Sequence, residues 1–157
     1  MKGLEKHIQE MGLFFYLVAT NEQQAENLTQ KTINRLRDSN LQEIPNEFER
    51  DAKLFTLALQ VFYKSQKSPG WLKSVVQKSL PFLASHSVEL GPWKQFQRRA
   101  RTEDLVTVAL VGVLGLEAKV AANAQGVSEG TLKYRMARGL KQLSPLLAVE
   151  RGADGRA

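Results

Sequence analysis

The sequence contains no cysteine and only two histidines among its 157 residues. Without cysteine, neither disulfides nor thiolate metal sites can form, and cysteine usage does not indicate the redox compartment. His7 and His86 have no second ligand at a spacing typical of zinc sites. The sequence therefore predicts no metal and no cofactor.

The motifs of common enzymes are also missing. The sequence has no glycine-rich loop that could hold phosphates, no recognisable carboxylate pair and no nucleophile–histidine arrangement. Gly112, Gly115 and Gly126 are scattered, as is typical of helix ends or close packing. Of the function classes considered, an enzyme is the least favoured, and we expect none.

No apolar run in the sequence reaches the roughly 20 residues that a membrane-spanning helix needs. The apolar run at residues 11–19 follows Glu5 and Glu10, where a signal peptide would carry only positive charge. It also continues into a polar segment with helical periodicity. We therefore expect a buried helix, a cytoplasmic protein and no membrane partner.

The charge is unevenly distributed along the chain. The net charge is +6, yet residues 1–60 carry seven Lys/Arg and nine Asp/Glu, giving −2. Residues 94–143 carry nine Lys/Arg and four Asp/Glu, giving +5. A basic half is typical of nucleic-acid binding, because each neutralised phosphate releases condensed counterions. Alone this is a weak indication, since many proteins without that function are basic.

Apolar residues recur with the period of a helix in nearly every segment. We predict an all-α fold of two small helical modules joined by a linker. The expected helices span 2–19, 21–37 with Asn21 as N-cap, 48–65, 71–84, 102–114, 117–125 and 128–143. The expected divisions are a front module at 1–65, a linker at 66–97, a back module at 98–145 and a flexible tail at 146–157.

Residues 117–143 carry the pattern of a helix-turn-helix. Ala122 is small where the two helices would cross, and Gly126 can take the left-handed conformation of the turn. Val127 can pack on the inner side of the turn, Ser128 can cap the next helix, and the side chain of Leu132 would point into the core. Because these residues meet several independent structural requirements of a helix-turn-helix at the right spacing, the segment predicts a unit that binds duplex DNA.

The last helix divides into two faces. We expect Leu132, Met136, Leu140 and Leu143 to face inward. The outward or flanking residues are Lys133, Tyr134, Arg135, Ala137, Arg138 and Lys141. Such a helix fits the major groove, with early residues near base edges and later basic residues near phosphates. Taken by itself, the helix is better explained as an amphipathic helix with a solvated basic face, but together with the preceding turn it favours DNA binding.

Residues 114–138, LGLEAKVAANAQGVSEGTLKYRMAR, resemble region 4 of extracytoplasmic-function sigma factors. In that family a GLS…IA…GVSEGTVKSRLxRAR pattern forms the helix-turn-helix that reads the −35 promoter element. The resemblance implies that Lys133, Tyr134, Ala137 and Arg138 face the promoter, with Thr131 and Arg135 near the DNA backbone. Ala121 and Gln125 replace a large aliphatic residue and a leucine, so the first helix is expected to be less well anchored.

Residues 21–33, NEQQAENLTQKTI, resemble the AEDLxQETF signature of sigma region 2, which contacts RNA polymerase. The implied polymerase-contact residues are Glu26, Asn27, Gln30 and Lys31. Asn27 and Lys31 stand where the family usually has aspartate and glutamate. The helix expected to hold melted DNA is mostly apolar here, which leaves Lys53, Tyr63 and Lys64 as candidates.

Three function classes follow from these patterns. The first is a sigma-like transcription regulator that binds duplex DNA through its back module and contacts RNA polymerase core through its front one. The second is a sigma mimic that binds an anti-sigma-type protein and has little affinity for DNA. The third, an enzyme, has no motif to support it.

Overall fold

The computed structural model describes residues 2–19, 21–66 and 91–154, and the side chains of residues 5–148 within them. Over these residues the fold is all-α, as predicted, and no strand is present. The expected helix at 71–84 and His86 lie outside the described residues. None of the helices within these ranges is both long and apolar enough to cross a bilayer.

The front module consists of α1 (Lys2–Val18), α2 (Glu22–Asp38) and α3 (Glu47–Gln66), with a 3-10 turn at Leu41–Glu43. As predicted, Asn21 caps α2, because its side chain accepts a hydrogen bond of 2.7 Å from the amide of Gln24. The apolar positions of α2 recur every three or four residues and bury one face, formed by Ala25, Leu28, Thr32 and Leu36.

Large aromatic side chains fill the core of the front module. Phe14 and Phe15 of α1 and Phe55 of α3 are fully buried, and Phe62 is 1% exposed. Phe14 lies edge-on to Phe55 and Phe62, with 6.4 Å between ring centroids in both pairs. The front module therefore has an aromatic core between α1 and α3, covered by α2.

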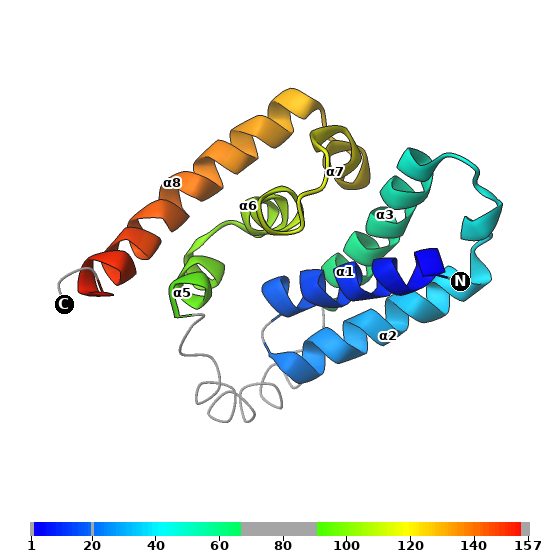
Figure 1. The fold of residues 1–157 in the computed structure, drawn as a ribbon, viewed down its shortest axis with the longest axis horizontal. Helices are drawn as coiled ribbons and strands as arrows, with labels where there is room; N and C mark the ends of the chain where they lie inside the picture. Colours follow the sequence, from blue (N-terminus) through cyan, green and yellow to red (C-terminus); the bar gives the residue numbers. More distant parts are fainter. Residues whose placement is uncertain (1, 20, 67–90, 155–157) are drawn as a thin grey trace.

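The back module consists of α5 (Gly91–Arg99), α6 (Thr102–Thr107), α7 (Ala118–Gln125) and α8 (Glu129–Asp154). Figure 1 shows α8 as a long rod along one edge of the molecule, with α5, α6 and α7 between it and the front module. Helix α5 begins within the expected linker and packs against α8. The boundary between linker and back module stays an expectation.

Two helices end differently from the sequence-based expectation. The helix expected at 102–114 changes at Val108–Val113 into a π-helical segment, in which the Leu114 amide bonds to the Ala109 carbonyl. Helix α8 continues through Pro145 to Asp154 rather than ending near 143. Proline removes one backbone hydrogen bond, but Leu143 and Leu146 belong to the packed core on either side of it, which supports the helix there.

The two modules share one core. Helix α7 packs against α3, and buried residues of both modules form one continuous cluster. Trp93 of α5 donates a hydrogen bond of 2.8 Å to the carbonyl of Leu17, and Gln97 donates one of 2.6 Å to that of Ala19. These bonds satisfy carbonyls at the end of α1 that its own helix leaves free. The modules are therefore joined by both apolar packing and hydrogen bonds.

Candidate nucleic-acid interface

Helices α7 and α8 form the helix-turn-helix that the sequence predicts. Gly126 lies in the left-handed region at φ +67° and ends α7, while its amide bonds to the Asn123 carbonyl. The Ser128 hydroxyl accepts a hydrogen bond of 3.2 Å from the Thr131 amide at the start of α8. Ala122 and Leu132 are buried at 3% and 2% exposure. The turn chemistry expected from the sequence is confirmed at each of these residues.

The seven residues predicted to bind DNA all lie on the first half of α8, and their exposure differs. The exposed members are Thr131, Lys133, Tyr134, Ala137 and Lys141, whereas Arg135 and Arg138 are half-buried. Tyr134 is the most exposed large hydrophobic residue in the described ranges, at 64%. Leu140 was expected to face inward but is 40% exposed. The residue before it, Gly139, is buried instead.

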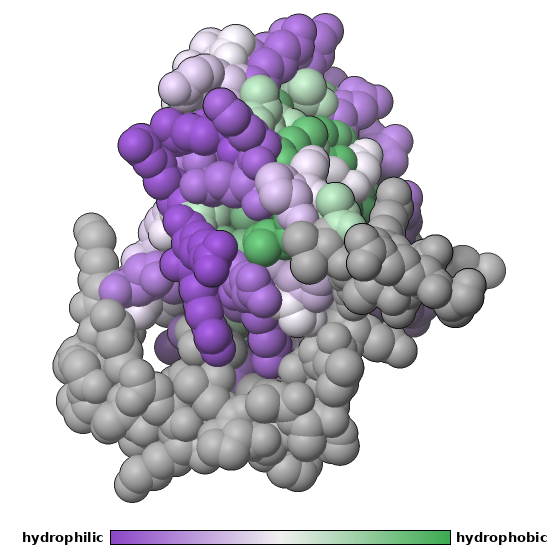
Figure 2. Space-filling view, turned by 90° about the vertical axis from the view of Figure 1, so that its left-hand side faces the viewer, coloured by the Kyte–Doolittle hydropathy of each residue, from purple (hydrophilic) through white to green (hydrophobic). Residues whose placement is uncertain are grey.

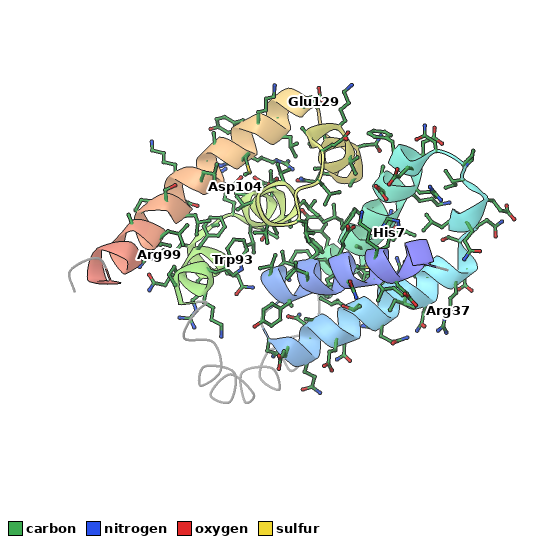
Figure 3. The ribbon with its side chains drawn as sticks, in the orientation of Figure 1. His7, Arg37, Trp93, Arg99, Asp104 and Glu129 are labelled. Atoms are coloured by element: carbon green, nitrogen blue, oxygen red, sulfur yellow. The ribbon has the colours of Figure 1, made fainter. Side chains whose placement is uncertain are left out.

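Arg138 is held by an ion pair within the back module. Its Nε donates to one carboxylate oxygen of Asp104 at 2.6 Å, and its Nη2 donates to the other at 2.9 Å. Nη2 also donates to Glu103 at 3.2 Å. The Asp104 side chain is 1% exposed, and Figure 3 places this residue between α6 and α8. Hydrogen bonding to Asp104 raises the pKa of Arg138 above its usual value, so the guanidinium stays charged.

Arg135 is held by a second polar contact, which also anchors α7. Its Nη1 donates a hydrogen bond of 2.8 Å to the side-chain oxygen of Gln125. The amide nitrogen of Gln125 in turn lies 3.1 Å from the hydroxyl of Thr107 on α6. Ala121 is fully buried, and α7 packs against α3. In this chain, close packing at Ala121 and hydrogen bonds at Gln125 hold α7 in place; the expectation that these residues anchor it less well than the family's larger aliphatic side chains stays a prediction.

Gly139 sets the distance between α8 and the helix beneath it. A Cβ atom at this position would lie 2.6 Å from Cγ2 of Val108 and 3.4 Å from the backbone oxygen of Asp104. Only glycine fits without a shift of these atoms, so α8 approaches α6 closely at this point. The close approach is what brings Arg138, the residue next to Gly139, within reach of Asp104.

A basic cluster on α5 and just after it was not singled out from the sequence. It consists of Lys94, Arg98, Arg99 and Arg101, and no described residue forms an ion pair with any of them. Figure 2 shows the side of the molecule where α5 and the second half of α8 lie, and its coloured surface is largely hydrophilic. The excess positive charge of residues 94–143 was the signal that could have located this cluster.

The residues predicted to contact RNA polymerase lie on the outer face of α2. All four of these residues, Glu26, Asn27, Gln30 and Lys31, are exposed. Glu26 and Gln30 line one wall of a groove between α1 and α2 whose other residues are Ile8, Gly12, Tyr16, Glu22, Ala25 and Thr29. The groove is therefore lined by both apolar residues and two glutamates.

The three candidates for binding melted DNA all lie at the surface of α3. Lys53 and Lys64 are exposed on α3, and Tyr63 is 37% exposed at its end. Burial of its inner part raises the pKa of Tyr63, and the charge of Arg135 on α8 acts in the opposite direction. Tyr63 at the end of α3 is therefore close enough to α8 to sense the charge of Arg135.

The described residues contain no group of three or more side chains that could hold a metal ion. One further cluster of titratable groups consists of His7, Glu10 and Asp51, where the His7 ring is 3.5 Å from Asp51 and 3.7 Å from Glu10. Figure 3 shows His7 on α1, on the side that faces α3. The contact joins these two helices of the front module.

Comparison with known protein families finds no match, and no curated protein matches the sequence. Among solved structures, the chain is similar to the sigma factor RpoE of Bartonella quintana, seen in a co-crystal structure with the anti-sigma factor NepR. The TM-score is 0.73 at 20% sequence identity, and the match covers 96% of this chain and 97% of the other. The chain therefore has the all-α fold of an extracytoplasmic-function sigma factor, as the sequence predicted.

Proposed function

We propose that this chain is a sigma-like transcription regulator that binds duplex promoter DNA through α7 and α8. One observation carries the proposal: the helix-turn-helix presents Lys133, Tyr134 and Lys141 on one exposed side of its second helix. Lysines there can neutralise phosphates, and the early turns of such a helix can reach base edges in the major groove. Exposed Ala137 lies between them and permits close approach to the DNA.

A second candidate partner is favoured by the groove between α1 and α2. Its apolar residues and two glutamates fit an amphipathic helix with basic residues, and binding of a helix in a groove is one of the common modes of peptide recognition. RNA polymerase core and an anti-sigma-type protein are the two occupants that the fold supports. The RpoE structure is that of a complex with an anti-sigma factor, which supports an anti-sigma-type protein as an occupant. The alternative function is then a sigma mimic that binds such a protein and has little affinity for DNA.

Duplex binding is tested by fluorescence anisotropy with a random pool of labelled duplexes at several salt concentrations. Lys133→Ala and Lys141→Ala should each weaken binding, and each should reduce the salt slope by about one if its lysine neutralises a phosphate. Lys31→Ala is a matched control, because Lys31 is also an exposed helical lysine but lies on α2. If Lys133→Ala and Lys141→Ala bind duplex with the same affinity and the same salt slope as Lys31→Ala, the proposal that α8 binds DNA is wrong.

Protein binding by α2 is tested separately by retention of RNA polymerase core and of a purified anti-sigma-type protein. Asn27→Asp restores a negative charge on the exposed face of α2 and should strengthen retention of core polymerase. Retention that is unchanged by this variant would contradict the proposed contact of α2. Strong binding of the anti-sigma-type protein without any duplex affinity would favour the sigma mimic.

A further inference from the structure

Arg138 stands at a predicted DNA-facing position but is engaged inside the protein. Its Nε and Nη2 bind both oxygens of a carboxylate that is almost fully buried, and Nη2 also reaches Glu103. The bidentate geometry is the strongest form of such a pair. If Arg138 turned to a phosphate, Asp104 would be left as an unpaired buried charge, which is strongly unfavourable.

The same guanidinium supports an aromatic ring on its other side. Cζ of Arg138 lies 5.1 Å from the centroid of the Tyr134 ring, one helical turn earlier on α8. Arginine over an aromatic face is a favourable cation–π arrangement. Tyr134 is nevertheless 64% exposed, so its outer part is free to meet a partner. A side chain this exposed would otherwise lose rotational freedom on binding.

Together the three residues form a chain of contacts from the interior to the surface. Asp104 is fixed by burial on α6, Arg138 is fixed by Asp104, and Tyr134 rests on Arg138. Gly139 allows the close helix approach on which the first contact depends. Asp104 and Arg138 therefore act by holding another side chain, whereas Tyr134 is the residue of the three that reaches the surface.

We propose that Arg138 is a positioning residue that holds the ring of Tyr134 toward the major groove, and that Tyr134 selects a base pair there. The ring presents apolar edge atoms, whose natural partner in the major groove is the methyl group of thymine. The proposal rests on the proposed duplex binding by α8. It separates the role of Arg138 from that of Lys133, whose exposed side chain is free to neutralise a phosphate.

The test compares four variants of the full chain by the slope of affinity against salt and by the duplexes selected from a random pool. Asp104→Asn/Arg138→Gln removes both charges of the pair but keeps hydrogen-bonding groups. It should leave the salt slope unchanged and weaken the preference for thymine at one position by about 5-fold or more. Tyr134→Ala should weaken the same preference, and Tyr134→Phe should keep it. Lys133→Ala should reduce the salt slope by about one.

A decrease of the salt slope by about one in the double variant would show that Arg138 neutralises a phosphate and would overturn the proposal. An unchanged base preference in Tyr134→Ala would overturn it as well. If the double variant fails to fold, the proposal is tested instead by the NMR resonance of the side-chain Nε–H of Arg138 in the wild-type chain. It should keep its position when duplex is added, and a large shift would contradict the proposal. Absence of duplex binding by the wild-type chain would instead remove the proposed function itself.

Discussion

The contacts that stabilise the interior of the front module differ from those that stabilise the interior of the back module. The front module has an aromatic core of Phe14, Phe15, Phe55 and Phe62. The back module also buries large apolar side chains, such as Phe96 and Leu110. In addition it depends on a small residue and a polar pair between helices, Gly139 beside Val108 and Arg138 on Asp104. Apolar cores tolerate substitutions of similar volume, whereas a bidentate pair and a close helix crossing depend on particular atoms.

This difference indicates which module positions functional side chains. Polar pairs in the back module fix the inner side of α8 and leave Lys133, Tyr134 and Lys141 exposed on its outer side. The front module supplies a rigid support, since α3 packs against α7 and α1 bonds to α5. The following variants test whether the modules differ in this way while folding as one unit.

The largest expected effect is that of Phe55→Ala. Removal of a fully buried aromatic ring should lower the free energy of unfolding by about 3–5 kcal/mol. Because the modules share a core, thermal unfolding followed by circular dichroism should remain a single transition at a lower temperature. A second transition, with α8 still folded after the front module has melted, would show that the modules unfold independently.

The next effect concerns the crossing of α8 and α6. Gly139→Ala should lower the free energy of unfolding by about 1–3 kcal/mol, because the added Cβ would overlap Cγ2 of Val108. Gly130→Ala is the matched control on the same helix, since its Cβ would meet nothing closer than 3.9 Å. It should be neutral or stabilise by up to about 1 kcal/mol. Denaturant midpoints measure both, and equal effects would contradict the close approach.

The smallest effect is expected at Asp51 in the front module. Burial raises the pKa of Asp51 in the folded chain, Glu47 and Glu10 raise it further, and His7 and Lys6 lower it. The charged carboxylate therefore costs stability above its folded pKa, and this cost disappears as the pH falls below the ordinary value of about 3.9. Asp51→Asn should stabilise the chain at pH 7 by less than about 1 kcal/mol, since Asp51 is partly exposed.

Urea unfolding at pH 7 and at about pH 3.5 checks this sign. The gain from Asp51→Asn should shrink at the lower pH, where the wild-type carboxyl is protonated. A variant that is less stable than the wild type at pH 7 would instead show that the contact with His7 outweighs the burial of the charge.

What the sequence predicted correctly was mostly local. Asn21 as a cap and Gly126 with Ser128 at the turn depend on residues within a few positions of each other, and each has a definite backbone requirement. The end of α8 was misplaced because Pro145 is a local signal that tertiary packing overrides.

The partners of the polar side chains could not be read from the sequence. Arg138 meets Asp104 across 34 residues, and Gln125 meets Thr107 across 18. Periodicity places each of these residues on a face of a helix but does not say which helix lies opposite. The packing of α7 on α3 is a contact of the same long-range kind, and it explains why Ala121 is buried.

The most direct test of the account is amide chemical-shift mapping of the full isotope-labelled chain during titration with duplex DNA from the selected pool. The account predicts salt-sensitive shifts at Thr131, Lys133, Tyr134 and Lys141 on α8, with the resonances of α2 unchanged. Shifts confined to α2 and the groove beside it, or none at all, would contradict the claim that the exposed side of α8 is the DNA-binding surface.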